Sequence, residues 1–483
     1  MELLIILLLS LSLFFLLKWR NYHARKLHRR PPGPRGLPLI GKMHQFDSSN
    51  THLYLLQLSK IYGPLVHLQL GSVPVLVISS ASAAKEIFKY HDHCFSSRPA
   101  LVGAQKLSYN GLDLAFAPYN DYWKNTRKLC TLHLFSSKRA QSFRPLREEE
   151  VARMVKTIHD KANTSAESNI VNLSKTNRFW ENNGMSTRIH WVLNATQASF
   201  ASFFLADYFP LWGSLLDRLG GARARLDKNF DELNVFYHQL IDEHMHASTA
   251  SAQECSILDI LLQMNKDSSG ITFDHIKAIL MNVIVAGTGS SAEVVAWAMT
   301  LLIKNPTTMN KAQQEVRELT GKKGFIDESN LQKLVYLKAI VKEAIRLHPP
   351  APLLVPRETT EKCVVSGYQI EAKTRVYINA YAIGRDPESW ENPDEFSPER
   401  FIDSTIDFKG QDFELIPFGA GRRMCPGISM GVATTELVLA NLLYSFDWEL
   451  HPGKRAEDID MATLPGITTH KKNDLCLVPK AIN

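Results

Sequence analysis

Net charge is nearly absent from this 483-residue chain once its first thirty residues are set aside. The chain has 55 Lys and Arg against 49 Asp and Glu, a formal net charge of +6. Residues 1–30 hold six of the basic residues against Glu2 alone, which gives +5, so the rest of the chain carries +1. This balance removes the main electrostatic argument for a nucleic-acid partner.

Internal repeats and low-complexity tracts are also missing. The chain is long and 45% hydrophobic, enough to bury a large core, so we expect one large globular body. Residues 31–38, rich in Pro and Gly, are the one clear linker, because such a segment is stiff and does not continue a helix.

Cysteine is scarce, with six residues in the whole chain. Around Cys425 there is no other Cys or His for forty residues upstream or twenty downstream. Structural zinc needs several sulfur or nitrogen ligands, so this absence excludes a local zinc site at Cys425. Two interpretations remain: a buried free cysteine in a glycine-rich turn, or a single thiolate ligand, which points to haem.

The loop around Cys425 favours the second interpretation. Its three glycines permit backbone conformations closed to other residues and let the chain pass close to a bulky flat ligand. Pro426 suits the first position of a helix, which would place Cys425 at the amino end of that helix. The helix dipole, with the charges of Arg422 and Arg423, then predicts a lowered pKa for the thiol.

At this loop the chain resembles the cytochromes P450, whose signature has a phenylalanine, glycines and an arginine ahead of the cysteine and a glycine after it. The matching positions are Phe418, Gly419, Gly421, Arg422, Cys425 and Gly427. The resemblance covers essentially the whole chain, with every motif in the family's order. Residues 31–38, 206–210 and 297–299 look like the plant microsomal branch that acts in specialised metabolism.

The resemblance implies a cytochrome P450 fold, mainly α with a small β region, and a haem-thiolate monooxygenase. Cys425 would be the axial ligand of haem b, with electrons from NADPH arriving through a reductase. One atom of dioxygen would enter an apolar small-molecule plant metabolite. The cofactor contacts that carry over are Trp123, Arg127, Ala286, Arg357, Pro417, Phe418, Arg423 and Gly427. Arginine suits the haem carboxylates because its planar fork can bind both oxygens.

A second motif pairs Glu343 with Arg346, three residues apart on one helix face. Alone, such a pair is usually a surface ion pair worth a few tenths of a kcal/mol. The resemblance adds Arg400, from Phe-x-Pro-Glu-Arg-Phe, and implies a buried network with a structural role, bracing the cysteine loop.

The amino terminus is expected to anchor the protein in a membrane. Leu3 to Leu17 is apolar except for two serines, and a basic cluster follows at once. We therefore expect a transmembrane anchor at 1–20, a basic and proline-rich hinge at 21–38, and the haem domain at 39–483. The alternative is a cleaved secretory signal. Because positive residues stay cytoplasmic, the body should face the cytosol from the endoplasmic reticulum membrane in a single-pass arrangement.

Periodicity predicts a mainly helical body with a small sheet drawn from both ends of the chain. Paired strands are expected at 65–70 and 73–79, followed by a helix over 83–90, and long helices dominate from about 118 to 347. Further strands are expected at 363–365, 368–370 and 375–379. The central helix should begin after Thr272, a plausible cap, and end at Lys304, before Asn305-Pro306.

The middle of that central helix departs from the family's pattern. The family usually has an acid followed by an alcohol there, and this chain has Gly289 and Ser290. The pair helps deliver protons in the reaction, so we expect Ser290 and water to serve instead. Glu293, one turn beyond Gly289, is a further candidate. The missing acid keeps two alternatives open: a non-oxygenating isomerisation or dehydration, or a non-catalytic haem protein.

Two surfaces of the body are expected to meet partners. Lys124, Lys128, Lys138 and Arg139 form either a basic face for an acidic reductase or a merely solvated face. The substrate pocket should draw on residues 98–122, 203–216, 286–291, 353–355 and 464–467, which are largely apolar. Residues 177–196 match the plant pattern poorly, and we have no physical account of that stretch.

Overall fold

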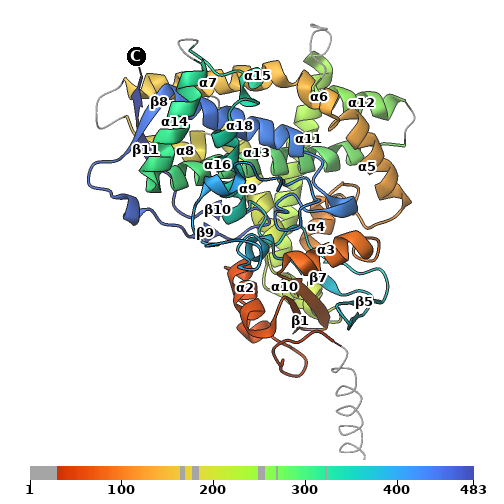
Figure 1. The fold of residues 1–483 in the computed structure, drawn as a ribbon. Helices are drawn as coiled ribbons and strands as arrows, with labels where there is room; N and C mark the ends of the chain where they lie inside the picture. Colours follow the sequence, from red (N-terminus) through yellow and green to blue (C-terminus); the bar gives the residue numbers. More distant parts are fainter. Residues whose placement is uncertain are drawn as a thin grey trace, which may run out of the picture.

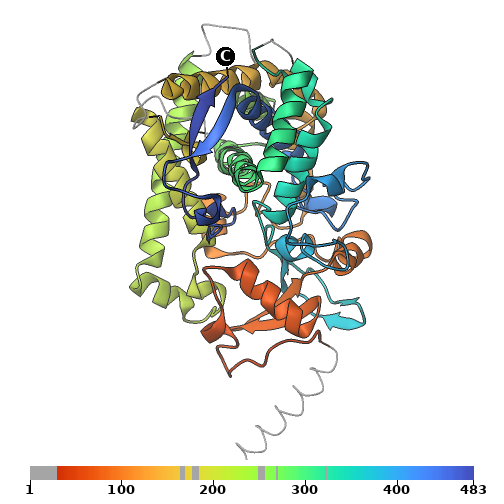
Figure 2. The ribbon, with the colours of Figure 1, turned by 60° about the vertical axis from the view of Figure 1, so that its left-hand side comes forward.

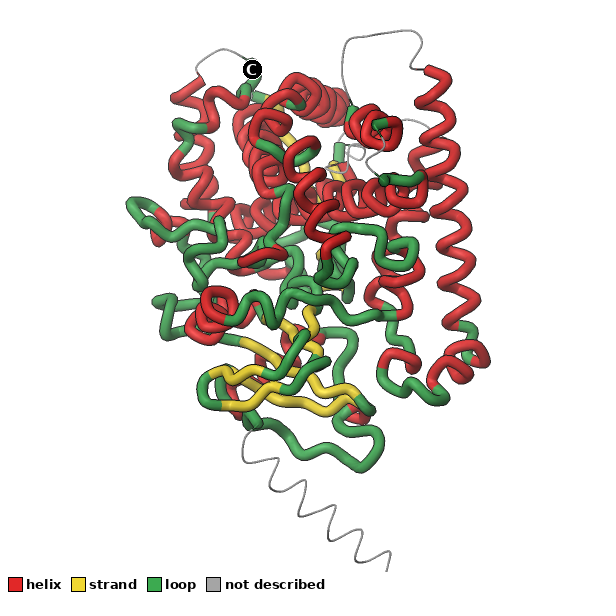
Figure 3. The backbone as a smooth tube through the Cα atoms, turned by 90° about the vertical axis from the view of Figure 1, so that its right-hand side faces the viewer, coloured by secondary structure: helices red, strands yellow, loops and turns green. Residues whose placement is uncertain are grey.

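The computed structural model describes residues 30–163, 169–176, 184–247, 256–267, 270–320 and 324–482 (Figure 1). The expected anchor at 1–20 lies outside these residues, as do residues 177–183 of the unmatched stretch. The body is mainly helical with small sheets, as expected from periodicity. The largest sheet lies at one end of the body (Figure 3), and the strands β8 (Phe446–Leu450) and β11 (Cys476–Ala481) lie at the other end (Figure 1).

The main sheet joins strands from both ends of the chain. Its order is β1 (Leu65–Leu70), β2 (Val73–Ile78), β7 (Arg375–Ile378) and β4 (Arg357–Glu358). Strand β1 pairs antiparallel with β2, and β2 runs parallel to β7 with Val75 opposite Arg375. The sequence prediction is confirmed, and Arg357 is thereby fixed at the edge of a rigid sheet.

The proline-rich segment is packed against the body where the structure describes it. The backbone of His67 on β1 donates to the carbonyl of Pro32 at 2.8 Å. A β-carbon on Gly33 would lie 1.9 Å from the carbonyl oxygen of His67, so only glycine fits there. From Pro32 onward the segment follows β1, which fixes the direction in which the chain enters the body.

Helix α13 (Phe273–Lys304) forms the centre of the body. At its start, the side chain of Thr272 accepts from the backbone N–H of His275, and the side chain of His275 accepts from the backbone N–H of Thr272. Asp274 lies in the first turn, as predicted. Its 32 residues span about 48 Å at the usual rise. Figure 2 views it nearly end-on with the other helices around it. Its carboxyl half is buried against α16 (Val335–Leu347) and α18 (Ile428–Ser445).

The remaining elements surround this centre. The other helices are α2 (Thr51–Tyr62), α3 (Ala81–Tyr90), α4 (Val102–Leu107), α5 (Asp121–His133), α6 (Ser137–Ser142), α7 (Arg144–Ala162), α8 (Leu173–Thr176), α9 (Gly184–Ala201), α10 (Gly213–Leu219), α11 (Ala222–Ala247), α12 (Ile257–Lys266), α14 (Pro306–Thr320), α15 (Glu328–Leu331) and α17 (Ala380–Ile383). The other strands are β3 (Val171–Asn172), β5 (Cys363–Val365), β6 (Tyr368–Ile370), β8 (Phe446–Leu450), β9 (Thr463–Leu464), β10 (His470–Lys471) and β11 (Cys476–Ala481).

Among the described residues, α13 and α18 are long and apolar enough to cross a membrane by length and composition alone. Half or more of each helix's apolar window is buried inside the body. Both therefore serve as core helices, which accounts for their hydrophobicity without a membrane.

The Glu343 network is buried, as the resemblance implied. Arg346 makes two contacts with the Glu343 carboxylate, at 2.6 and 2.8 Å, and both side chains are fully buried. Arg400 Nε adds a third contact to the same carboxylate at 3.1 Å. Arg346 also donates to the carbonyls of Gly384, Pro393 and Glu395. The network thus fixes residues 384–400 and touches no part of the cysteine loop directly.

An apolar cluster transmits that support to the cysteine loop. Trp390, Phe401, Phe408 and Leu415 form its buried part, and Phe418 packs against it. The rings of Phe408 and Phe418 meet edge-to-face, with centroids 5.4 Å apart. The bracing predicted from sequence is therefore indirect, because ring packing connects the charged network to the loop.

Replacing Arg346 by Met should leave the buried Glu343 carboxylate short of a charge partner. Breaking a buried pair in this way costs about 3–5 kcal/mol of unfolding free energy. Urea unfolding followed by circular dichroism measures the loss. Arg153→Met is the matched control, because Arg153 pairs on the surface of α7 and should cost under about 1 kcal/mol. Equal effects of the two substitutions would contradict a supporting role for the network.

Candidate active site around Cys425

The cysteine loop is held by hydrogen bonds within its own backbone. The N–H of Cys425 donates to the carbonyl of Phe418 at 2.9 Å, and the N–H of Gly427 donates to the Cys425 sulfur. Gly419 and Gly421 have φ of +72° and +68°, so glycine is required at both, as predicted. Gly427 has φ of −87°, and a β-carbon there would lie 3.9 Å from the Cys425 sulfur, an ordinary contact, so the described chain does not itself require glycine at this position.

The helix after the loop begins later than the sequence suggested. Pro426 precedes Gly427, which is the N-cap, and α18 starts at Ile428. The expectation of Pro426 at the first helical position is wrong by two residues. A β-carbon on Gly431 would lie 3.7 Å from the hydroxyl of Ser291 on α13. The start of α18 therefore places Cys425 beside the middle of α13.

The charge near the sulfur comes from Arg127. Burial raises the pKa of the Cys425 thiol, and the Gly427 N–H and the Arg127 charge oppose that shift. Arg422, which was expected to lower the pKa, is 48% exposed and pairs with Asp92 instead. The sulfur remains accessible although protein surrounds it, as for a group on the wall of an internal space. A bound metal deprotonates a thiol outright, so a neutral thiol without metal is compatible with ligation.

Four arginines gather around this loop, of which Arg98, Arg357 and Arg423 are buried and Arg127 is partly buried. Arg127 on α5 donates to the carbonyl of Met424, and Arg357 on β4 donates to that of Ala420 at 2.9 Å. Arg423 donates to the carbonyls of Ser96 and Ala117 at 2.8 and 2.6 Å. Arg98 donates to the carbonyls of Ala115 and Val355 at 2.8 and 2.6 Å.

The four guanidinium groups repel one another. Burial, followed by the charges of Arg423 and Arg357, lowers the pKa of Arg98 far below its usual value. Burial and the Arg357 charge lower the pKa of Arg423 to about 9, and burial lowers that of Arg357 to about 10. Two carboxylates, Asp92 and Asp113, oppose these shifts. Burial itself raises the pKa of Asp113 to about 6, which weakens its compensation.

The structure brings together most of the predicted cofactor residues. Trp123 lies under the guanidinium of Arg423, with 3.9 Å from the carbon to the ring centroid, and its ring N–H donates to the carbonyl of Leu114. Pro417 is buried within the loop, and Ala286 on α13 is accessible. The resemblance implied that the ring N–H of Trp123 would bond a haem carboxylate, but here it bonds a backbone carbonyl. Trp123 contacts the site through its ring, which packs against Arg423.

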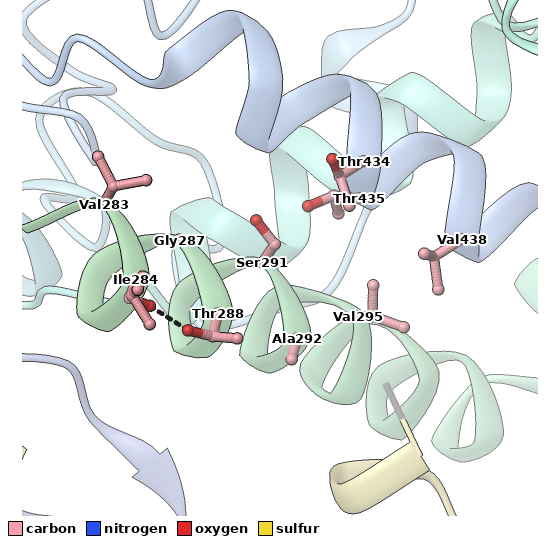
Figure 4. A pocket seen from close by; sticks show the side chains of 10 residues that line it. All are labelled: Val283, Ile284, Gly287, Thr288, Ser291, Ala292, Val295, Thr434, Thr435 and Val438. Atoms are coloured by element: carbon pink, nitrogen blue, oxygen red, sulfur yellow. Dashed lines mark hydrogen bonds between the residues drawn. The ribbon is translucent and has the colours of Figure 1, made fainter. Parts of the chain in front are cut away.

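A cavity of about 220 Å³ lies where α13 separates from α18 (Figure 4). It is lined by Val283, Ile284, Gly287, Thr288, Ser291, Ala292, Val295, Thr434, Thr435 and Val438. Gly287 has open space around its α-carbon. Glycine within a helix lowers helix stability by about 1 kcal/mol relative to alanine. Its presence at position 287 is consistent with a flat group that packs against the helix there.

Gly289 faces away from open space and toward two polar side chains. A β-carbon at Gly289 would lie 2.9 Å from Nε2 of Gln197 on α9 and 3.4 Å from Cε1 of His470 on β10. His470 contacts Gln197 Oε1 through Nε2 and Glu293 Oε1 through Nδ1, the latter at 2.8 Å. Glu293 is 2% exposed, and its second oxygen accepts from the backbone of Lys471 at 3.1 Å. The place of the family's acid is filled by this Gln197–His470–Glu293 chain.

Ser290 keeps a hydroxyl on the accessible side of α13. Its Oγ donates to the carbonyl of Ala286 at 2.7 Å. Sequence reasoning found Ser290, Gly289 and Glu293 but missed Arg98, Gln197 and His470. Arg98 is the first residue of the segment 98–122 that was expected to line the substrate pocket, and this position was the one sequence clue to it. Gln197 and His470 belong to no recognisable motif, and only the folded structure brings them to α13.

Most of the chain matches a known family. The family model for cytochrome P450 covers residues 31–478. A solved structure of a zebrafish cytochrome P450 with abiraterone has the same fold, with a TM-score of 0.73, 22% identity, and coverage of 89% of this chain and 100% of that one.

Closer relatives come from plants. A 6,7,8-trihydroxycoumarin synthase of Pastinaca sativa is 48% identical over 481 residues, covering 95% of each chain. A strychnine-11-hydroxylase of Strychnos nux-vomica is 44% identical over 485 residues, covering 98% of this chain and 95% of that one. These names favour an oxidising enzyme over the isomerase, dehydratase or non-catalytic alternatives. The chain belongs to the cytochrome P450 family, as its cysteine loop first indicated, and is a haem-dependent monooxygenase.

Proposed function

We propose that this chain binds haem b between the Cys425 loop and α13 and uses it to hydroxylate a flat, oxygen-containing plant metabolite. The observation that carries the proposal is the excess of buried positive charge at the loop. Four guanidinium groups face two acids, so an anionic ligand with two carboxylates would balance them. Haem b has that charge and a flat shape.

Each predicted residue then has a definite role. Cys425 would supply the sulfur that holds the iron, and Gly427 would support it with a backbone donor. Phe418 and Pro417 would shape the loop side of the site, and Ala286 would contribute from α13. Arg357 and Arg423 would bind the haem carboxylates, together with Arg98 and Arg127. When bound, the haem iron supplies the dioxygen activation that defines the family.

Proton supply follows from the departure at Gly289. The buried carboxylate of Glu293 is joined through His470 to Gln197, whose Nε2 lies 3.4 Å from the carbonyl of Val285. This chain holds an exchangeable proton on the imidazole where the family's acid would stand. Ser290, with bound water, carries the proton onward from the accessible side of α13.

The substrate class is suggested by the relatives and by one aromatic pair. Two relatives from Pastinaca sativa are named for coumarin and xanthotoxin products. Phe116 and Phe200 stack with centroids 4.6 Å apart and planes 18° apart. The segment before Phe116 is bonded to Asn282, one turn before Ala286, and Phe200 is on α9, one turn after Gln197. The pair is therefore near the central segment of α13, where a flat aromatic substrate would stack.

Electron supply and location extend the proposal. The consecutive helices α5 and α6 carry three exposed lysines, Lys124, Lys128 and Lys138. Arg127 is also on α5. We assign this face to an NADPH-dependent reductase with an acidic surface, because α5 leads directly to the cysteine loop through Arg127. Residues 1–20 would anchor the protein to the endoplasmic reticulum, with the body cytosolic.

Cys425→Ser should remove the long-wavelength band that sulfur-ligated haem gives with carbon monoxide after reduction. Cys476→Ser, on β11 and exposed, is the control and should keep the band. Difference spectroscopy of both purified proteins, matched for haem content, measures the effect. A normal band from Cys425→Ser would overturn the cofactor assignment.

His470→Phe should lower product formed per NADPH several-fold, since general acid–base groups contribute about 10²–10⁴ in rate. Introducing Gly289→Asp into this variant, together with Gln197→Ala to clear the space, should restore much of the loss. His451→Phe, at an exposed histidine, is the control. If His470→Phe left coupling unchanged, the proton route through this chain would be wrong.

Phe116→Ala should weaken binding of coumarin-type ligands by about 2–12-fold, the range of an aromatic contact worth 0.5–1.5 kcal/mol. Titration of the haem Soret band measures binding. Phe46→Ala, which removes a remote edge-to-face pair with Tyr54, is the control. A panel in which coumarins cause no Soret shift, while larger apolar metabolites do, would contradict the substrate class.

A further inference from the structure

A second group of metal-binding side chains lies outside the active site. The donor atoms of His93, Cys94 and Glu361 all lie within 4.8 Å of one another. His93 Nε2 is 3.0 Å from Glu361 Oε1, and the Cys94 sulfur is 3.2 Å from that oxygen and 3.3 Å from that nitrogen. The three donors thus form a closed triangle.

A second thiol lies near the group. Cys363, the first residue of β5, is close enough for its thiol to influence the pKa of that of Cys94, although it lies outside the trio whose donors are all within 4.8 Å of one another. It packs against the same apolar cluster that buries Cys94. The set then has two sulfurs, one imidazole nitrogen and one carboxylate oxygen, the number and types that zinc takes in tetrahedral sites.

We propose that His93, Cys94, Glu361 and Cys363 bind one zinc ion. Zinc bonds of 2.0–2.3 Å in a tetrahedron put the donors roughly 3.3–3.8 Å apart. The three measured separations, all among His93, Cys94 and Glu361, are within a few tenths of an ångström of that range. Small rotations suffice for these three donors, and Cys363 has to rotate further toward them to become the fourth. Thiolate sulfur disfavours calcium and magnesium, which take oxygen ligands.

The backbone holds the donors in place before any metal arrives. The segment after α3 and the segment before β5 are far apart in sequence, yet the N–H of Thr360 donates to the carbonyl of Cys94 at 2.9 Å. The N–H of Glu358 donates to the carbonyl of Ser97, also at 2.9 Å. Cys94 is 4% exposed, whereas the side chains of His93 and Glu361 are each 57% exposed. The site is rigid at its base and open to solvent at its edge, which gives an ion a way in.

Zinc at this position would act on the segment that supports the active-site arginines. Asp92, next to His93, accepts from the backbone and side chain of Arg422 at 3.1 and 3.2 Å. It also lies 3.5 Å from Arg357. The metal would therefore clamp residues 92–96 to β5 and stiffen one wall of the cysteine loop. The zinc proposal itself does not depend on haem.

The test uses the full-length haem protein, purified with a reductant and without chelator. After incubation with one equivalent of zinc chloride and desalting, mass spectrometry of the metal should find about one zinc per chain. Zinc should also slow alkylation of Cys94 and Cys363, read by peptide mass spectrometry. Alkylation of Cys476 should not change. Haem content, measured on each sample, separates loss of zinc from loss of the proposed function.

Variants locate the ion. Cys363→Ser and Glu361→Gln should each weaken zinc retention at least tenfold. Cys476→Ser is the control and should leave zinc retention unchanged. Glu361→Gln keeps the test valid if a cysteine variant misfolds, because Glu361 is exposed. Wild-type protein that retains no zinc would overturn the proposal. Zinc retention that neither variant reduces would also overturn the proposal. So would a Cys94–Cys363 disulfide that persists in reductant and prevents zinc from binding.

Discussion

Placing four guanidinium groups beside one cysteine loop, three of them on buried arginines, costs free energy through desolvation and mutual repulsion. Each of Arg98, Arg127, Arg357 and Arg423 comes from a different part of the chain and spends its donors on backbone carbonyls. Those bonds orient the groups without neutralising their charge. An anionic partner therefore has a site prepared for it, and the loop that carries Cys425 is fixed by the same contacts.

Rigidity around the loop comes from two further sources of different physical character. The Glu343 network fixes residues 384–400 by charge-assisted hydrogen bonds, and aromatic packing between Phe408 and Phe418 passes that support to the loop. On the other side, α13 presents a central stretch with little side-chain volume. Its buried stripe packs against α18, the helix that begins three residues after Cys425.

The centre of α13 also illustrates how one missing side chain can be replaced by others. With glycine at 289, Gln197 and His470 approach the helix closely, and the buried Glu293 carboxylate pairs with the imidazole. In the proposed proton route, the acid function would pass to residues from α9, α13 and β10. Such a route would keep a carboxylate beside the centre of α13 while making it depend on the positions of three elements.

The sequence by itself determined the fold class, the family, the paired strands at both ends and the span of the central helix, because periodicity, capping and an ordered motif are local properties of the chain. It proposed Cys425 as the haem ligand. It also identified Glu343 with its two arginines. It misjudged the source of the charge near the sulfur: Arg422 turns outward to Asp92, and Arg127 on α5 takes its place. Arg98, Gln197, His470 and the His93–Cys94–Glu361–Cys363 group became visible only in three dimensions. Each owes its surroundings to contacts between segments separated by many residues, and no local pattern encodes such contacts.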